Sequence, residues 1–246
     1  NDNSNLQTEL KKLQDEVVRK VKKGASIIHL IEDLPKQGSL PINALLAVGS
    51  VHQRLVKLGL RSDANIIVTT SSARDTHQIA CLIGFGATAV YPTLAYQTIL
   101  DLTDRNELKG DAHENCSRYR KGINKGLLKI ISKMGISTIS SYRGSQLFEI
   151  VGLDKDVVDL CFTNTESRIK GKKFKDLDLE LRSLNEYARS NIADMKVGGL
   201  LKYIHGGEYH TYNPEIVKKL QEAVNSGLNS TYQNYSSLVD NRPPAM

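Results

Sequence analysis

Short apolar runs alternate with longer segments of helical periodicity through the first 150 residues, and this alternation constrains the fold more than any other feature. The runs are rich in β-branched residues and lack polar alternation, which is typical of a parallel sheet with helices on both faces. Four such β-α repeats predict either half of a β/α barrel or a short doubly wound sheet. Strands are expected at 24–33, 64–72, 87–92 and 135–142, and helices at 6–23, 41–59, 73–86, 93–103, 116–134 and 145–153.

The pattern changes after Gly152. Strand signals become sparse, and helical periodicity dominates the segments 154–162, 174–191 and 214–227. We therefore expect a mainly helical second part that leans on the first part or on another chain segment. The predicted fold class is α/β, with a partial, barrel-like parallel β/α sheet (a degenerate half of a TIM-like barrel) followed by a mainly helical segment.

Composition limits the classes of function. The net charge is +6, but the lysines are dispersed and aromatic residues make up only 6% of the chain, so we expect no nucleic-acid partner. No apolar run approaches the roughly 20 residues that span a bilayer, and the first residues are polar. We therefore expect no membrane partner and a cytoplasmic location. Cys81, Cys116 and Cys161 are far apart and lie in or beside apolar patterns, so buried free thiols are expected.

The loop after the second expected strand is a candidate phosphate site. Residues 66–91 follow the order strand, small-residue loop, helix and strand, with which β/α barrels bind phosphate through backbone N–H groups. Ser71, Ser72 and Arg74 are the candidate anion ligands. The loop lacks a glycine, which would let the backbone approach a phosphate closely. We favour the alternative that Ser72 caps the following helix, with Asp75 in its first turn.

The expected helix at 116–134 is strongly basic. Its apolar residues recur at helical spacing, so one face is core and the cations form the solvated or interdomain side, rather than a site for a phosphate backbone. Gly122 and Gly126 each cost up to about 1 kcal/mol in helix propensity. We expect close packing against that face, and a neighbouring domain is the first choice of partner. The cations are Arg118, Arg120, Lys121, Lys125, Lys129 and Lys133.

His205, Glu208 and His210 carry suitable chemistry for zinc, but their spacing fits no established pattern. Two glycines between them break any helix that would align the side chains. The stretch "YNPE" that follows predicts a helix start, with an asparagine cap and proline at the first position. We therefore favour a structured turn over a metal site. The chain also contains no GxSxG, P-loop lysine or CxxC motif.

Several stretches together resemble the large (α) subunit of glutamate synthase, most closely the bacterial, NADPH-dependent type. They are "YRKGINKGLLKIISKMGISTISSYRGSQLFEIVGL", "IGFGATAVYPTLAY" and "GGLLKYIHGGEYHTYNPEIVKKLQEAV". The resemblance covers the chain from about Gly24 to Pro243. It implies that residues 1–150 are the later part of a central α/β domain. Residues 151–246 would be a helical connector into the FMN-binding barrel, truncated at "NRPPAM".

The family's chemistry implies further partners. An N-terminal amidotransferase domain hydrolyses glutamine with a cysteine nucleophile, and ammonia passes through a tunnel to the FMN barrel. There 2-oxoglutarate is aminated and reduced, with electrons relayed by a 3Fe-4S cluster. The resemblance implies as partners the amidotransferase domain, the FMN barrel and a small NADPH-oxidising subunit.

This sequence departs from the family where its chemistry would lie. Asn1 is no nucleophile, and Cys81, Cys116 and Cys161 match none of the cluster ligands. Thr69 stands where the family usually has a glutamate. We therefore expect no catalytic, cofactor-binding or metal-binding residue here. The expected role is an interdomain scaffold and possible ammonia-tunnel wall that is inactive alone. A free-standing phosphate-binding domain and a protein-docking module remain alternatives.

Overall fold

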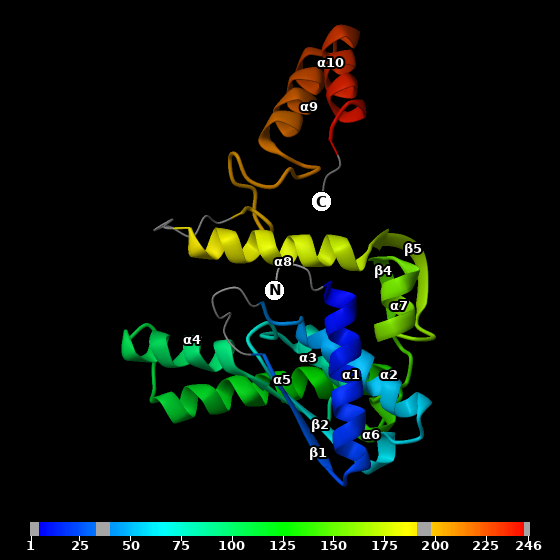
Figure 1. Cartoon of the computed structure of the whole chain (residues 1–246). Helices are drawn as coiled ribbons and strands as arrows, with labels where there is room; N and C mark the ends of the chain where they lie inside the picture. The colour runs from blue at the N-terminus through cyan, green and yellow to red at the C-terminus, as the bar shows by residue number, and fades with distance from the viewer. Residues whose placement is uncertain (1–4, 33–39, 191–197, 244–246) are drawn as a thin grey trace. The chain divides into compact units, whose positions relative to one another are not determined.

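The computed structural model describes residues 5–32, 40–190 and 198–243, which fall into two compact units, 1–187 and 188–246 (Figure 1). Asn1 and the last three residues of "NRPPAM" lie outside the described residues. The first unit, which ends within α8, contains α1 (Leu6–Lys22), β1 (Ile27–Ile31), α2 (Ala44–Lys57), the 3-10 turn η1 (Arg61–Asp63), β2 (Asn65–Thr70), α3 (Thr76–Gly84), β3 (Ala89–Pro92), α4 (Thr93–Asp104), α5 (Ala112–Lys133), α6 (Ile139–Tyr142), β4 (Glu149–Leu153), α7 (Lys155–Cys161), β5 (Glu166–Lys172) and α8 (Phe174–Arg189).

The predicted parallel α/β architecture is confirmed. Strands β1, β2 and β3 form one parallel sheet in chain order, with Ile28 opposite Ile66 and Val68 opposite Val90. Helices α2 and α3 connect successive strands, because parallel neighbours need a crossover. The result is a partial, barrel-like β/α arrangement followed by helices.

One face of this sheet carries the main core. Ile28, Ile66 and Val68 are buried against residues of α1, α2, α3 and α5. On the other face Ile27 and Ile31 are 60% and 56% exposed, and these two alternate with the buried Ile28. The expectation of helices on both faces is therefore wrong for the described residues. Uninterrupted apolar runs predict two buried faces, but here the second face of β1 lies open.

Two sequence-based assignments after α5 are also wrong. The expected strand at 135–142 contains the short helix α6, whose Tyr142 is fully buried. The expected helix at 145–153 is strand β4, which pairs in parallel with β5, a strand that the sequence analysis missed. In β4 the buried Ile150 is followed by Val151, which is 69% exposed, so the local burial follows a period of two. A second core of apolar residues from α1, α2, β4, α7 and α8 lies behind this small sheet.

Helix ends follow the capping residues that the sequence supplies. Asn5, Asn43, Asp111 and Asp154 each accept a backbone N–H of the helix that follows, at the start of α1, α2, α5 and α7. None of the helices in the described part of the chain combines the length and the apolarity needed to cross a bilayer.

The second unit contains α9 (Pro214–Ser226) and α10 (Asn229–Asp240), which pack against each other. Gly227 ends α9 with φ of 65°, the left-handed conformation that favours glycine at this position. Only Ile216 and Ala223 are buried within these two helices, so the described part of this unit has a small apolar core.

Candidate functional site

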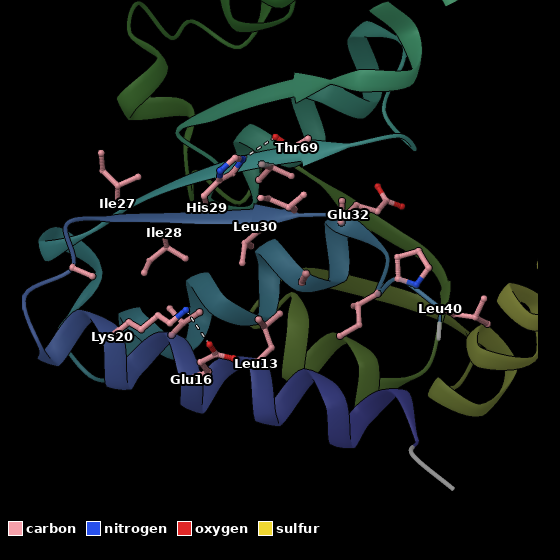
Figure 2. A pocket seen from close by; sticks show the side chains of 18 residues that line it. Leu13, Glu16, Lys20, Ile27, Ile28, His29, Leu30, Glu32, Leu40 and Thr69 are labelled. Carbon is pink, nitrogen blue, oxygen red and sulfur yellow. Dashed lines mark hydrogen bonds and ion pairs between the residues drawn. The ribbon is translucent and has the colours of Figure 1, made fainter. Parts of the chain in front are cut away.

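The carboxyl ends of β1 and β2 bring polar side chains together. Glu32 directly follows β1, and Thr70 is the last residue of β2. These parallel neighbours end at the same edge of the sheet, where the N–H of Glu32 donates to the Thr69 carbonyl at 2.9 Å. Figure 2 shows the Glu32 side chain beyond the end of β1. Open α/β sheets usually bind their ligands at this edge.

The Glu32 carboxylate accepts hydrogen bonds from the loop after β2, all at Oε2. The Ser71 N–H donates at 3.1 Å, the Ser72 hydroxyl lies at 3.3 Å, and the buried Thr70 hydroxyl makes a short contact. Thr70 Oγ1 also accepts the Ser72 N–H at 3.0 Å. The donors that would face a phosphate in a β/α barrel are therefore occupied by a carboxylate of the same chain.

The structure brings together two of the three candidate anion ligands. Ser71 and Ser72 both contact Glu32, whereas the backbone of Arg74 lies at the start of α3. The Arg74 N–H donates to Gln78 Oε1 at 2.9 Å, and its carbonyl accepts the Tyr119 hydroxyl at 2.8 Å. These backbone contacts fix the turn into α3.

The prediction that Ser72 caps α3 is wrong. The cap is Asp75, whose carboxylate accepts the Gln78 N–H at 2.8 Å. The Gln78 side chain accepts the Asp75 N–H in return, which completes a capping box. The helix begins at Thr76, three residues later than predicted, so Ser72 is too far from its first turn to act as a cap.

A cavity of about 630 Å³ lies beside β1, between α1 and residues 40–47. In Figure 2, Ile28 and Leu30 point toward α1, while Ile27 and His29 point to the opposite side of the strand. His29 Nε2 lies 2.8 Å from the hydroxyl of Thr69. The lining combines apolar residues with polar ones, of which Glu16 pairs with Lys20 and His29 with Thr69, while Glu32 accepts hydrogen bonds from the loop after β2.

Three tyrosines cluster near the carboxyl end of β3. Tyr91 at the end of β3 stacks on Tyr96 of α4, which meets Tyr119 of α5 edge to face. Burial raises the pKa of Tyr96 and of Tyr119 above the ordinary value. Both hydroxyls therefore stay protonated at neutral pH and do not act as bases.

The cysteines are free thiols, of which Cys161 is buried and Cys81 and Cys116 are half-buried. Burial raises the pKa of Cys81 to about 11 and that of Cys161 to about 12. Cys81 Sγ lies 3.6 Å from His77 Nε2, one turn earlier on α3. Because the reactive form of cysteine is the thiolate, neither Cys81 nor Cys161 is activated as a nucleophile.

The basic helix α5 packs closely at only one of its two glycines. A Cβ added at Gly126 would lie 2.6 Å from Cγ2 and Oγ1 of Thr76, at the start of α3. A Cβ at Gly122 would meet nothing within 4 Å of the described chain. The close packing expected here is confirmed at Gly126, but its partner is a helix of the same unit and not a neighbouring domain.

In the second unit, His205 and Glu208 are exposed, and His210 Nε2 lies 2.5 Å from the Gly199 carbonyl. The side chain of Asn213 accepts the N–H groups of Glu215 and Ile216, so the predicted cap of α9 is confirmed. Within the ranges that the structure describes, no three His, Cys, Asp or Glu side chains gather as a metal site.

Sequence reasoning missed Glu32. Its signal was an acidic residue directly after a buried strand, in a chain whose next strand ends in hydroxyl side chains. In a parallel sheet such positions become neighbours, although 38 residues separate Glu32 from Thr70.

The sequence model of the protein family described as the glutamate synthase central domain matches residues 1–154 of this chain. The chain belongs to the glutamate synthase family. It is 43% identical to the ferredoxin-dependent glutamate synthase of Pyropia yezoensis and 44% identical to that of Cyanidium caldarium. Each match covers 82% of this chain and 14% of the relative. It is 35% identical to the large chain of the NADPH glutamate synthase of Bacillus subtilis (strain 168), over 96% of this chain and 16% of the relative.

These glutamate synthases are much longer than this chain, which spans about one seventh of their length. The family assignment therefore concerns the central domain. A solved flavocytochrome b2 with sulfite bound overlaps 59% of this chain and 37% of its own, with a TM-score of 0.40 at 14% identity. That overlap is too loose to support an argument.

Proposed function

We propose that this chain is a non-catalytic scaffold within a glutamate synthase, which converts glutamine, 2-oxoglutarate and a reductant into two molecules of glutamate. In this proposal residues 1–150 belong to the later part of the central domain, and residues 151–246 lead toward the FMN barrel. The domain holds the amidotransferase and FMN domains in place and forms part of the ammonia-tunnel wall, in the cytoplasm. The match to the central-domain model supports this role.

The contact of Glu32 with the loop after β2 carries the proposal. An FMN phosphate would need the donors of this loop, but the Ser71 N–H and the Ser72 hydroxyl already face the Glu32 carboxylate. A bound phosphate would also be repelled by that negative charge, because like charges at hydrogen-bonding distance strongly oppose each other. The loop therefore does not fit FMN.

A 3Fe-4S cluster does not fit either. Such clusters need several cysteine thiolates close together. Cys81 and Cys161 have raised pKa values. Among the described residues no group of three potential ligands is present. In the proposal both cofactors are bound by other domains of the enzyme. The small NADPH-oxidising subunit is a separate chain.

The test uses the purified 246-residue chain. We expect colourless protein, no saturable heat when FMN is titrated in a calorimeter, and neither glutaminase nor synthase turnover. The positive control is a complete glutamate synthase under the same conditions. A flavin absorption band in the purified chain, or amide hydrolysis without added domains, would contradict the proposal.

The electron donor is a finer prediction. The sequence resemblance predicts the NADPH-dependent type, and relatives of both donor types match at 35–44% identity. The assay compares NADPH and reduced ferredoxin as donors for the complete enzyme that contains this domain. Turnover with ferredoxin alone would overturn the NADPH prediction and leave the scaffold role untouched.

A further inference from the structure

Strand β1 has a free edge, the side of its backbone that faces away from β2. In the described chain the sheet order β1-β2-β3 places β2 on one side of β1 and no strand on the other. The Glu32 N–H donates to the Thr69 carbonyl at 2.9 Å, so Glu32 and the even-numbered residues of the strand face β2. Because backbone groups alternate between the two sides of a strand, the N–H and C=O groups of Ile27, His29 and Ile31 lie at the free edge.

This free edge lacks the features that usually protect an edge strand. Edge strands commonly carry a lysine, a proline or a bulge that prevents pairing with another strand. Residues 27–31, "IIHLI", contain neither lysine nor proline, and their register with β2 is regular. Ile27, His29 and Ile31 are exposed in the described chain. The edge is therefore open to a further strand, which would form hydrogen bonds with these three residues.

The cavity of about 630 Å³ beside β1 runs along this free edge. Every residue of β1 lines it, although successive side chains point to opposite faces of the sheet, so the cavity lies beside the strand and not over one face alone. Across from β1 it is bounded by Leu13, Glu16 and Lys20 of α1, whose side chains point toward the strand in Figure 2. Residues 40–42 add an apolar wall. A strand added at the free edge would place the side chains of one face in this cavity.

The winding of the sheet indicates which strand fits this edge. Helix α2 connects β1 to β2, α3 connects β2 to β3, and α1, α2 and α3 all contribute to the core on the same face. In such arrays each helix joins two neighbouring parallel strands by a right-handed crossover. Helix α1 packs against α2 and leads into β1. The strand that matches α1 would therefore precede this helix and lie at the free edge of β1.

We propose that the free edge of β1 binds a parallel strand of the glutamate synthase polypeptide that precedes α1 and lies outside these 246 residues. Two relatives are matched over only 14% and 16% of their length, so the family's polypeptide has ample sequence for such a strand. The strand would be apolar on both faces, because it would meet Leu13 and Val17 on the side of α1 and Ile27 and Ile31 on the open side. This inference rests on the proposed place of the chain within a glutamate synthase.

The test compares amide hydrogen exchange in the 246-residue chain and in a complete glutamate synthase that contains it, read by mass spectrometry at single-residue resolution. In the chain alone, the amides of Ile27, His29 and Ile31 should exchange about tenfold faster than those of Ile28 and Leu30, which face β2. In the complete enzyme the three free-edge amides should become about tenfold slower, because the added strand accepts their hydrogen bonds.

Equal exchange of the three free-edge amides in both proteins would overturn the proposal. Protection in the chain alone that rises with protein concentration would overturn it as well, because a second copy would then occupy the edge. Either result leaves the scaffold role untouched, since FMN binding and turnover decide that role separately.

Ile31→Pro and Leu30→Pro form a matched pair of variants. Proline removes one backbone N–H and is tolerated in a strand where that N–H faces solvent. Ile31→Pro should change the melting temperature of the 246-residue chain by less than about 3 °C, whereas Leu30→Pro, whose N–H faces β2, should lower it by about 5 °C or more. In the complete enzyme, Ile31→Pro should speed the exchange of Ile27 and His29 about tenfold.

A larger loss of melting temperature in Ile31→Pro than in Leu30→Pro would show that the free amides lie on the other side of β1, and it would overturn the proposal. If neither variant folds by circular dichroism, the exchange of the two wild-type proteins decides.

Discussion

At the scale of single residues, the loop after β2 shows how one side chain changes the chemistry of a familiar arrangement. The sequence indicates the donors, Ser71 and Ser72, but not their acceptor. Glu32 supplies it from the neighbouring strand and so completes the hydrogen bonds of Thr70, which is fully buried. A buried hydroxyl without a partner is costly, so this contact should contribute to stability as well as exclude anions.

Replacing Glu32→Gln should lower the free energy of unfolding by about 1–3 kcal/mol. Glutamine loses the charge that strengthens these hydrogen bonds. Urea denaturation followed by circular dichroism measures the change. The matched control is Glu107→Gln, at an exposed glutamate, which should change stability by less than about 0.5 kcal/mol. Equal effects of the two substitutions would show that the Glu32 contact contributes nothing specific.

His52 should make the stability depend on pH. Burial, and then the charges of Arg61 and Arg143, lower its folded pKa to about 4 from the ordinary 6.5, so the unfolded chain binds a proton more readily between these values. The contribution of the neutral His52 ring to the free energy of unfolding is fully present above pH 6.5. It is lost as the pH falls through 4, and the loss is up to about 3 kcal/mol. Urea unfolding at pH 4.5 and 7 should show a smaller difference for His52→Gln than for wild type. His113→Gln, at an exposed histidine, should retain the wild-type difference.

At the scale of elements, the two glycines of α5 differ. Close packing explains the glycine at position 126 but not the one at position 122. Gly126 allows α5 to approach Thr76 at the start of α3, and Gly122 faces open space. The sequence predicted close packing at both. It could not separate them, because four residues bring both to nearly the same face of a helix, and only the position of α3 distinguishes them.

Alanine at these two glycines should therefore have opposite effects. Gly126→Ala should destabilise the fold by about 1–2 kcal/mol, because its methyl group would collide with the stiff, β-branched Thr76. Gly122→Ala should stabilise it by up to about 1 kcal/mol, because alanine favours the helix and meets no neighbour. Thermal unfolding of both variants checks the signs, and a stabilised Gly126→Ala would contradict the packing described here.

At the scale of the whole molecule, each unit exposes apolar side chains. Ile27, Ile31 and Tyr91 lie exposed on the first sheet, and Leu201 and Tyr212 of the second unit are 96% and 82% exposed. Such surfaces are more typical of a part of a larger protein than of a free-standing module. They agree with a family whose relatives are about six times as long as this chain.

The turn before α9 should not depend on a metal. His210 bonds the Gly199 carbonyl, while His205 and Glu208 are exposed. Treatment with EDTA should leave the far-ultraviolet circular dichroism and the melting temperature of the chain unchanged. Added zinc should change the melting temperature of the wild-type chain no more than it changes that of a His205→Ala, His210→Ala variant. A melting temperature that falls by several degrees on chelation would contradict this assignment.

The sequence by itself determined the three parallel strands of the first sheet, the helices between them and the cap of α9. These features depend on periodicity and capping within a few residues, which a linear sequence contains. Tertiary structure alone decided that Glu32 fills the loop after β2, that one sheet face stays open and that Gly126 packs on Thr76. Each of these depends on which distant residues the strand register and helix packing bring together. The exchanged assignments of α6 and β4 have the same origin, because short apolar runs fit either period until their neighbours are placed.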